Sequence, residues 1–116
     1  MVQMTMHVSE ELAERLRPIG PWLPAVLELS LVGYRTLAAA TATEVIQFLA
    51  QDPTPQAVVN YHVSERAQER LQRLLTLNEA GMLGEEEQCE LDELERIEHV
   101  IVMLKAQAAE QKPQEF

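Results

Sequence analysis

The sequence predicts a mainly α-helical protein, in which a short N-terminal β-strand pairs between two copies and a C-terminal α-helical hairpin follows. Three observations support this fold class. Of the 116 residues, 47% are hydrophobic and only 4% aromatic, which is typical of packed helices built from Leu, Val, Ile, Ala and Met. Residues 2–8 alternate strictly between apolar and polar side chains. Residues 85–109 instead repeat their apolar positions at the spacing of a helix.

The N-terminal segment VQMTMHV, residues 2–8, has the two-residue period of a β-strand. One face is apolar and the other polar, with Val2, Met4, Met6 and Val8 opposite Gln3, Thr5 and His7. A single strand leaves its backbone N–H and C=O groups without partners. Residues 58–63, VVNYHV, alternate more weakly, so a second strand within the same chain is the alternative interpretation. We therefore expect residues 2–8 to pair with the same strand of a second copy.

The first helix is expected directly after this strand. Ser9 is a good N-cap, and Glu10 and Glu11 place negative charge at the positive end of the helix dipole. Pro18 and the Gly20-Pro21 pair end the helix early, because proline lacks a backbone donor and disfavours helix in the residue before it.

The middle of the chain predicts two further helical segments. One begins near Pro24 and runs to about Leu37, with an inner stripe of Leu23, Leu27 and Leu31. Residues 36–43 are small and weakly patterned, so we expect a connection or a frayed helix end there. Residues 43–50 predict a short amphipathic helix that DPTP, residues 52–55, ends.

The C-terminal half predicts the helical hairpin. One helix extends from Ser64 to Ala80 with Gly81 as its C-cap, and a second from about Glu85 to Ala109. HVSEELAERL at 7–16 and HVSERAQERL at 62–71 are similar, either because both are good helix starts or because the segment was duplicated. The expected organisation is residues 1–40 as an N-terminal dimerisation domain, 41–60 as a linker with a short helix, 61–110 as a helical hairpin and 111–116 as a disordered tail.

Charge and composition exclude several classes of protein. The net charge of −10 is unlike that of a protein that covers phosphates non-specifically. The three histidines are dispersed and the sequence lacks a cysteine pair or a glycine-rich phosphate loop, so we expect no enzyme, no metal site and no cofactor. Neither a signal peptide nor a membrane-spanning segment is indicated. We expect a soluble cytoplasmic protein whose single cysteine, Cys89, is an ordinary reduced thiol.

QMTMHVSEELAERL, residues 3–16, and the leucine stripe of LPAVLELSL, residues 23–31, resemble the ribbon-helix-helix family of bacterial repressors and antitoxins. The resemblance covers the N-terminal third of the chain and implies a homodimer whose two-stranded ribbon enters the major groove of operator DNA. It implies that the outward residues Gln3, Thr5 and His7 contact bases, since their side chains can hydrogen-bond base edges. Nearby cations are Arg15 and Arg17. The N–H groups near Leu23 and Ala25, at the start of the second helix, would hold a phosphate.

The C-terminal half is suited to a protein partner. Residues 85–98 contain eight acidic residues and one basic residue, Arg96. The expected partner-binding seam has helical spacing and consists of Leu94, Ile97, Ile101 and Leu104. A basic toxin encoded nearby would suit it, and residues 78–106 resemble the C-termini of small bacterial antitoxin-like proteins. The alternative is that this helix packs against residues 64–80, where Arg66, Arg70 and Arg73 neutralise its acids.

These observations predict an antitoxin-type transcriptional regulator that binds operator DNA through its N-terminal ribbon and neutralises a toxin through its acidic helices. The alternative is a dimeric helical adaptor or scaffold that has only protein partners and does not bind DNA.

Overall fold

The computed structural model describes residues 2–32 and 36–111, and the secondary structure within these ranges is helical. The elements are listed here in chain order: α1 Glu10–Leu16, the 3-10 helix η1 Arg17–Trp22, α2 Leu23–Ser30, α3 Ala38–Leu49, α4 Pro55–Val59, α5 Glu65–Glu79 and α6 Glu85–Gln111. The predicted mainly α-helical fold and the C-terminal hairpin are therefore confirmed. Residues 112–116 of the predicted tail lie outside the described residues.

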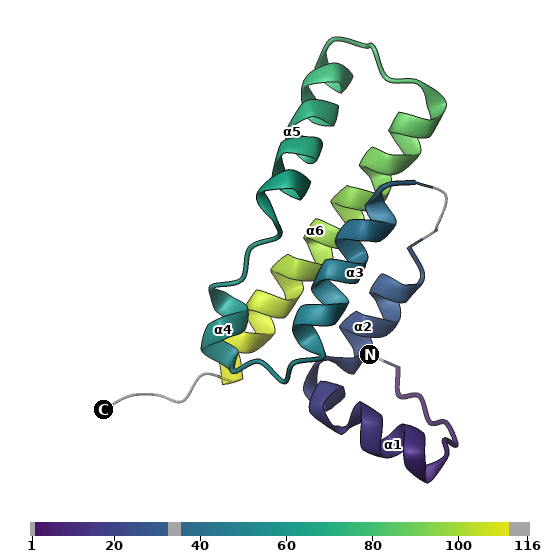
Figure 1. Ribbon diagram of the computed structural model, residues 1–116, viewed down its shortest axis with the longest axis vertical. Coiled ribbons are helices and arrows are strands. Elements are labelled where there is room, and N and C mark those ends of the chain that lie inside the picture. Colours follow the sequence, from purple (N-terminus) through teal and green to yellow (C-terminus); the bar gives the residue numbers. More distant parts are fainter. Residues whose placement is uncertain (1, 33–35, 112–116) are drawn as a thin grey trace.

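Helix α6 is the central element of the fold (Figure 1). It packs against α2, α3, α4 and α5, and its buried face supplies Leu91, Leu94, Ile97, Val100, Leu104 and Ala108 to the core. Trp22, Leu29, Val45, Leu49, Val58 and Leu74 complete this core from the other elements. Residues from 22 to 108 thus share one core, which unites the segments that the sequence assigned to separate units.

Helix α3 is longer than the sequence predicted. Residues 38–42, expected as part of a connection, form its first turns, and the predicted helix at 43–50 is its second half. Ala38, Thr41 and Ala42 are buried, because small side chains let the backbone of α3 come close to its neighbours. Tertiary packing therefore decides this helix where local pattern is weak.

The predicted inner stripe of α2 is wrong. Leu27 and Leu31 are exposed, Leu31 to 79%, whereas Leu29 and Val32 are buried. The reason is that α2 packs against α3 and α6, which contact the opposite side of this short helix. The helix also ends at Ser30, well before the predicted Leu37.

The hairpin turn follows the prediction closely. Gly81 has a positive φ of 69°, a conformation that glycine adopts without a Cβ clash. The Gly81 N–H donates to the Asn78 carbonyl at 3.0 Å, and the Met82 N–H donates to the Leu77 carbonyl at 2.9 Å. This pair of bonds is the Schellman arrangement that ends a helix at glycine.

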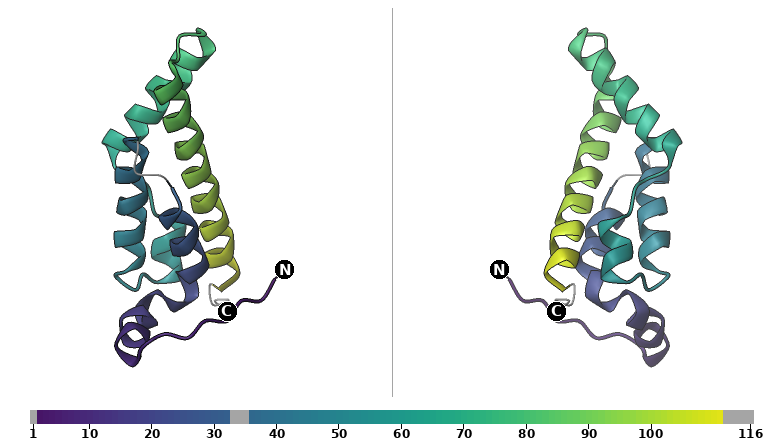
Figure 2. Two further views of the ribbon diagram at one scale, coloured as in Figure 1. Left: turned by 90° about the vertical axis from the view of Figure 1, so that its right-hand side faces the viewer. Right: turned by 90° about the vertical axis from the view of Figure 1, so that its left-hand side faces the viewer.

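The N-terminal segment lies outside the core. Residues 2–9 form no helix or strand, and Figure 2 shows their trace leaving α1 and passing below the helical body. The sequence predicted a strand at 2–8 paired with a second copy; the described residues contain no strand, and the paired ribbon stays a prediction. The alternative strand at 58–63 is wrong, since those residues belong to the end of α4 and a non-helical connection.

Candidate functional site

The residues predicted to contact DNA all lie at the N-terminal end, away from the core. Gln3, Thr5 and His7 are exposed, and the alternating apolar residues are exposed too, with Val2 at 93% and Met4 at 83%. Helix α1 contains no buried residue. Both faces of residues 2–8 are therefore accessible to another molecule.

The helix after this segment is fixed by its cap. The Leu12 N–H donates to Ser9 Oγ at 3.1 Å, as the sequence predicted from Ser9.

The two arginines near this segment, Arg15 and Arg17, differ in their surroundings. Arg17 Nη2 lies 2.7 Å from Glu14 Oε1, and both side chains are exposed. Arg15, also exposed, forms no recorded ion pair within the described ranges, so it is the better placed of the two for a phosphate.

Leu23, one of the two residues predicted to hold a phosphate, lies at the start of α2 with its backbone N–H already paired. Its backbone N–H donates to the Gly20 carbonyl, because the chain enters α2 directly from η1 instead of from an open loop. The second predicted residue, Ala25, is partly buried against the core. The Leu23 N–H is therefore already paired, whereas the predicted role of Ala25 stays a prediction.

The predicted partner-binding seam lies inside the protein. Leu94, Ile97 and Leu104 are buried, and Ile101 is partly buried against the same core. The chain's own helices thus cover these four side chains, as in the alternative that packs α6 within the chain.

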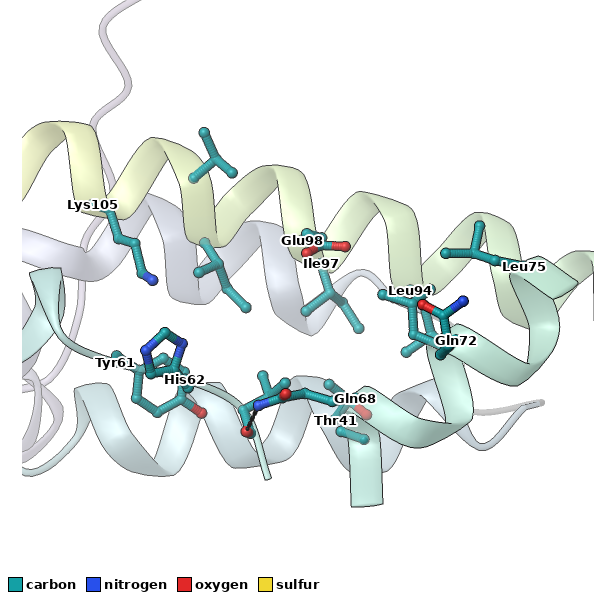
Figure 3. A pocket seen from close by; sticks show the side chains of 15 residues that line it. Thr41, Tyr61, His62, Gln68, Gln72, Leu75, Leu94, Ile97, Glu98 and Lys105 are labelled. Atoms are coloured by element: carbon teal, nitrogen blue, oxygen red, sulfur yellow. Dashed lines mark hydrogen bonds between the residues drawn. The ribbon is translucent and has the colours of Figure 1, made fainter. Parts of the chain in front are cut away.

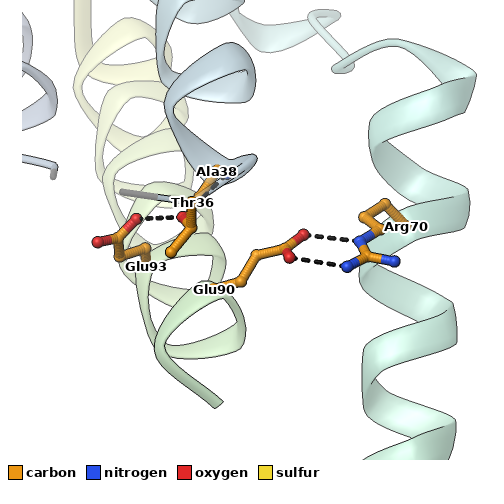
Figure 4. Close-up of polar contacts among 5 residues, drawn as sticks. All are labelled: Thr36, Ala38, Arg70, Glu90 and Glu93. Carbon is orange, nitrogen blue, oxygen red and sulfur yellow. Dashed lines mark hydrogen bonds and ion pairs between the residues drawn. The ribbon is translucent and has the colours of Figure 1, made fainter. Parts of the chain in front are cut away.

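Part of the acidic face of α6 is neutralised within the chain. Glu90 is only 4% exposed, and its carboxylate accepts two hydrogen bonds from Arg70 of α5, from Nε at 2.7 Å and from Nη2 at 2.8 Å (Figure 4). These hydrogen bonds raise the pKa of the Arg70 guanidinium. One helical turn on, Glu93 accepts a hydrogen bond from the Thr36 hydroxyl at 2.7 Å. Both acids therefore fix α6 to neighbouring segments.

A second polar cluster joins α3 to the start of α5. Glu44 accepts hydrogen bonds from the backbone N–H and the hydroxyl of Ser64, each at 2.9 Å. Beside it, Phe48 and Tyr61 stack with ring centroids 4.2 Å apart. Burial, and secondarily the charge of Glu44, raise the pKa of the Tyr61 hydroxyl. This cluster holds the connection between α4 and α5 against the body.

Searches against known proteins give no family assignment. No protein-family model, curated protein or solved structure matches the chain. Across residues 2–32 and 36–111, no helix has the length and hydropathy needed to cross a bilayer. The same residues contain no group of histidine, cysteine and acidic side chains arranged to hold a metal ion.

The structure brings together two residues that the sequence analysis did not select. Lys105 of α6 and His62 of the connection before α5 line the same groove, although they lie far apart in the chain. The one local signal was a lone basic residue, Lys105, in the apolar second half of α6. His62 carried none, because only the fold places it opposite α6.

Proposed function

We propose that this protein is a dimeric, cytoplasmic regulator of the antitoxin type. Two N-terminal segments pair into a ribbon that binds operator DNA, and the acidic helical body binds a basic toxin protein. The observation that carries the proposal is the exposure of residues 2–8, whose alternating apolar residues are between 40% and 93% exposed.

Pairing of residues 2–8 between two copies would stabilise this segment through hydrogen bonds and through burial of apolar side chains. An antiparallel ribbon gives the backbone N–H and C=O groups their partners. It also collects the apolar side chains of both copies, Val2, Met4, Met6 and Val8, on one face, where each copy shields the other from water. The opposite face of the ribbon then presents Gln3, Thr5 and His7 from each copy.

The charge distribution supports separate binding surfaces for DNA, at the N-terminal segment, and for the toxin, on the acidic helices. The segment before α1 has no acidic residue, whereas α6 begins with Glu85, Glu86 and Glu87. DNA binding is then confined to the ribbon and Arg15, because the body repels phosphate. A basic toxin is attracted to the acidic body, and toxin binding coupled to operator binding makes the regulator respond to free toxin.

The experiment is a gel-shift titration of the full chain with the DNA upstream of its gene, at about 50 mM salt where phosphate contacts are strong. Replacing Gln3, Thr5 and His7 together by alanine should abolish sequence preference and leave the dimer intact. The matched control replaces the same residue types on the body, Gln47, Thr43 and His99, all of them exposed. This control should bind like the wild type.

The second candidate is a dimeric adaptor with protein partners only, which the net charge of −10 favours. Sedimentation of the chain with the product of the adjacent gene separates the two. A toxin complex together with a DNA shift supports the regulator, whereas a protein complex without any DNA shift supports the adaptor. A chain that is monomeric at all concentrations contradicts both.

A further inference from the structure

A groove lies between α5 and α6. Figure 2 shows the two helices meeting at the turn near Gly81 and diverging below it. The space between them has a volume of about 450 Å³, within the range of small-molecule sites. Its apolar lining includes Val63, Leu71, Leu75, Leu94, Ile97 and Ile101. Leu94 and Ile97 are buried in the core, so the apolar surface left for a ligand comes from Val63, Leu71, Leu75 and Ile101, which are partly or fully exposed.

One end of the groove is cationic. Figure 3 shows Lys105 of α6 extending toward His62, beside Tyr61. Lys105 is partly buried, and no ion pair is recorded for its ammonium group within the described ranges. An ammonium group beside an apolar surface that partly excludes water attracts an anion more strongly than one in bulk water. This end of the groove thus suits the negatively charged head of a ligand.

The remaining polar residues limit that head to a single charge. Glu98 lies on the same helix two turns before Lys105 and also lines the groove. Its carboxylate repels a second negative charge further along the ligand. Gln68, on the α5 side, is held by a hydrogen bond from its Nε2 to the Val63 carbonyl at 2.9 Å. The middle of the groove therefore favours an uncharged tail.

We propose that the groove binds a medium-chain fatty acid, with its carboxylate at Lys105 and His62 and its alkyl chain along the apolar lining. The distance along α6 from Lys105 to Leu94 is about 16 Å, enough for an extended chain of this class. The proposal is independent of DNA binding, because the groove uses none of the residues of the N-terminal segment.

The test is calorimetric titration of the full chain with decanoate below its micelle concentration, with amide NMR shifts to locate the ligand. We expect saturable binding and shifts centred on the groove. Lys105→Gln should weaken binding about tenfold, the loss expected for a charge-assisted hydrogen bond. Arg96→Gln is the matched control, since it removes one positive charge from an exposed position of the same helix outside the groove lining. Its affinity should stay within about twofold of the wild type.

Two further arms address the tail and the single charge. Leu71→Trp fills the apolar lining without changing charge and should abolish binding, with circular dichroism confirming that the variant is folded. Decanedioate, which carries a second carboxylate, should bind more weakly than decanoate. Absence of saturable heat, or equal binding by the wild type, Lys105→Gln and Leu71→Trp, overturns the proposal. The proposal is also overturned if the amide NMR shifts of the groove residues change with protein concentration in the absence of decanoate. Such shifts would show that a second copy of the chain occupies the groove.

Discussion

Residues 2–16 and the core-forming residues between 22 and 108 differ in how far their apolar side chains are buried. The first region buries none of them fully, and the second builds one continuous core around α6. Both regions nevertheless contain a helix that begins at the glutamate of an HVSE sequence and is capped by its serine, Ser9 or Ser64. The comparison teaches that local sequence determines where a helix begins, whereas long-range contacts determine whether that helix joins the core.

The largest expected difference between the regions concerns truncation of apolar side chains. Ile97→Ala removes a buried side chain and should lower the free energy of unfolding by about 2–5 kcal/mol. Met6→Ala should change that of the monomer by less than about 0.5 kcal/mol, and weaken the proposed dimer. Urea denaturation followed by circular dichroism measures the first quantity and sedimentation the second. Equal losses of stability for both variants would contradict the division into two regions.

The next effect tests how the acidic helix is held in the body. Arg70→Ala leaves the buried Glu90 without its partner and should cost about 3 kcal/mol of unfolding free energy. Replacing the pair together, as Arg70→Met with Glu90→Leu, should recover most of the loss because no unpaired charge stays buried. The control, Arg17→Ala, removes the exposed ion pair with Glu14 and should cost far less. A double variant no more stable than Arg70→Ala would show that the charges themselves are needed.

A smaller effect is expected from the two caps. Ser64→Ala removes the hydroxyl that accepts from the Ala67 N–H at 3.2 Å and donates to Glu44, and it should lower overall stability by about 1–2 kcal/mol. Ser9→Ala should leave the melting temperature of the body unchanged and reduce only the amide protection of α1. Hydrogen exchange distinguishes local loss from global loss. A lowered melting temperature in Ser9→Ala would place α1 within the cooperative body.

The smallest effect is a pH dependence at alkaline pH. The pKa of Tyr61 is raised in the folded state above its usual value of 10.0. Above that value the unfolded chain loses its tyrosine proton first, so stability should fall as the pH rises through 10 and beyond. Tyr61→Phe should show a shallower fall over the same range. Identical alkaline profiles for the two proteins would show that Tyr61 does not contribute.

Much of the local structure followed from the sequence. Ser9, Ser64, Pro18 and Gly81 set helix ends close to where they were expected, since caps and proline act within one turn. The apolar residues that repeat at helical spacing in α6 were also correctly predicted to share one face of that helix. The face of α2 and the first turns of α3 could not be predicted, because short or small-residue segments take their orientation from neighbours that are distant in the chain.

The two candidate sites also differ in whether local sequence or distant contacts reveal them. The segment 2–8 was selected from its alternation, and the structure places it as exposed chain outside helices and strands. The groove was not found, because Lys105 and His62 come from distant parts of the chain and meet only when α6 packs beside the connection between α4 and α5.

The sequence by itself determined the helical composition, the positions of most helix ends and the two-faced character of residues 2–8, all of which depend on interactions between near neighbours. Only the tertiary structure decided that Leu94, Ile97 and Leu104 face the chain's own core, that Glu90 is buried with Arg70, and that a groove opens between α5 and α6. The physical reason is that an apolar stripe requires cover but does not specify which surface provides it.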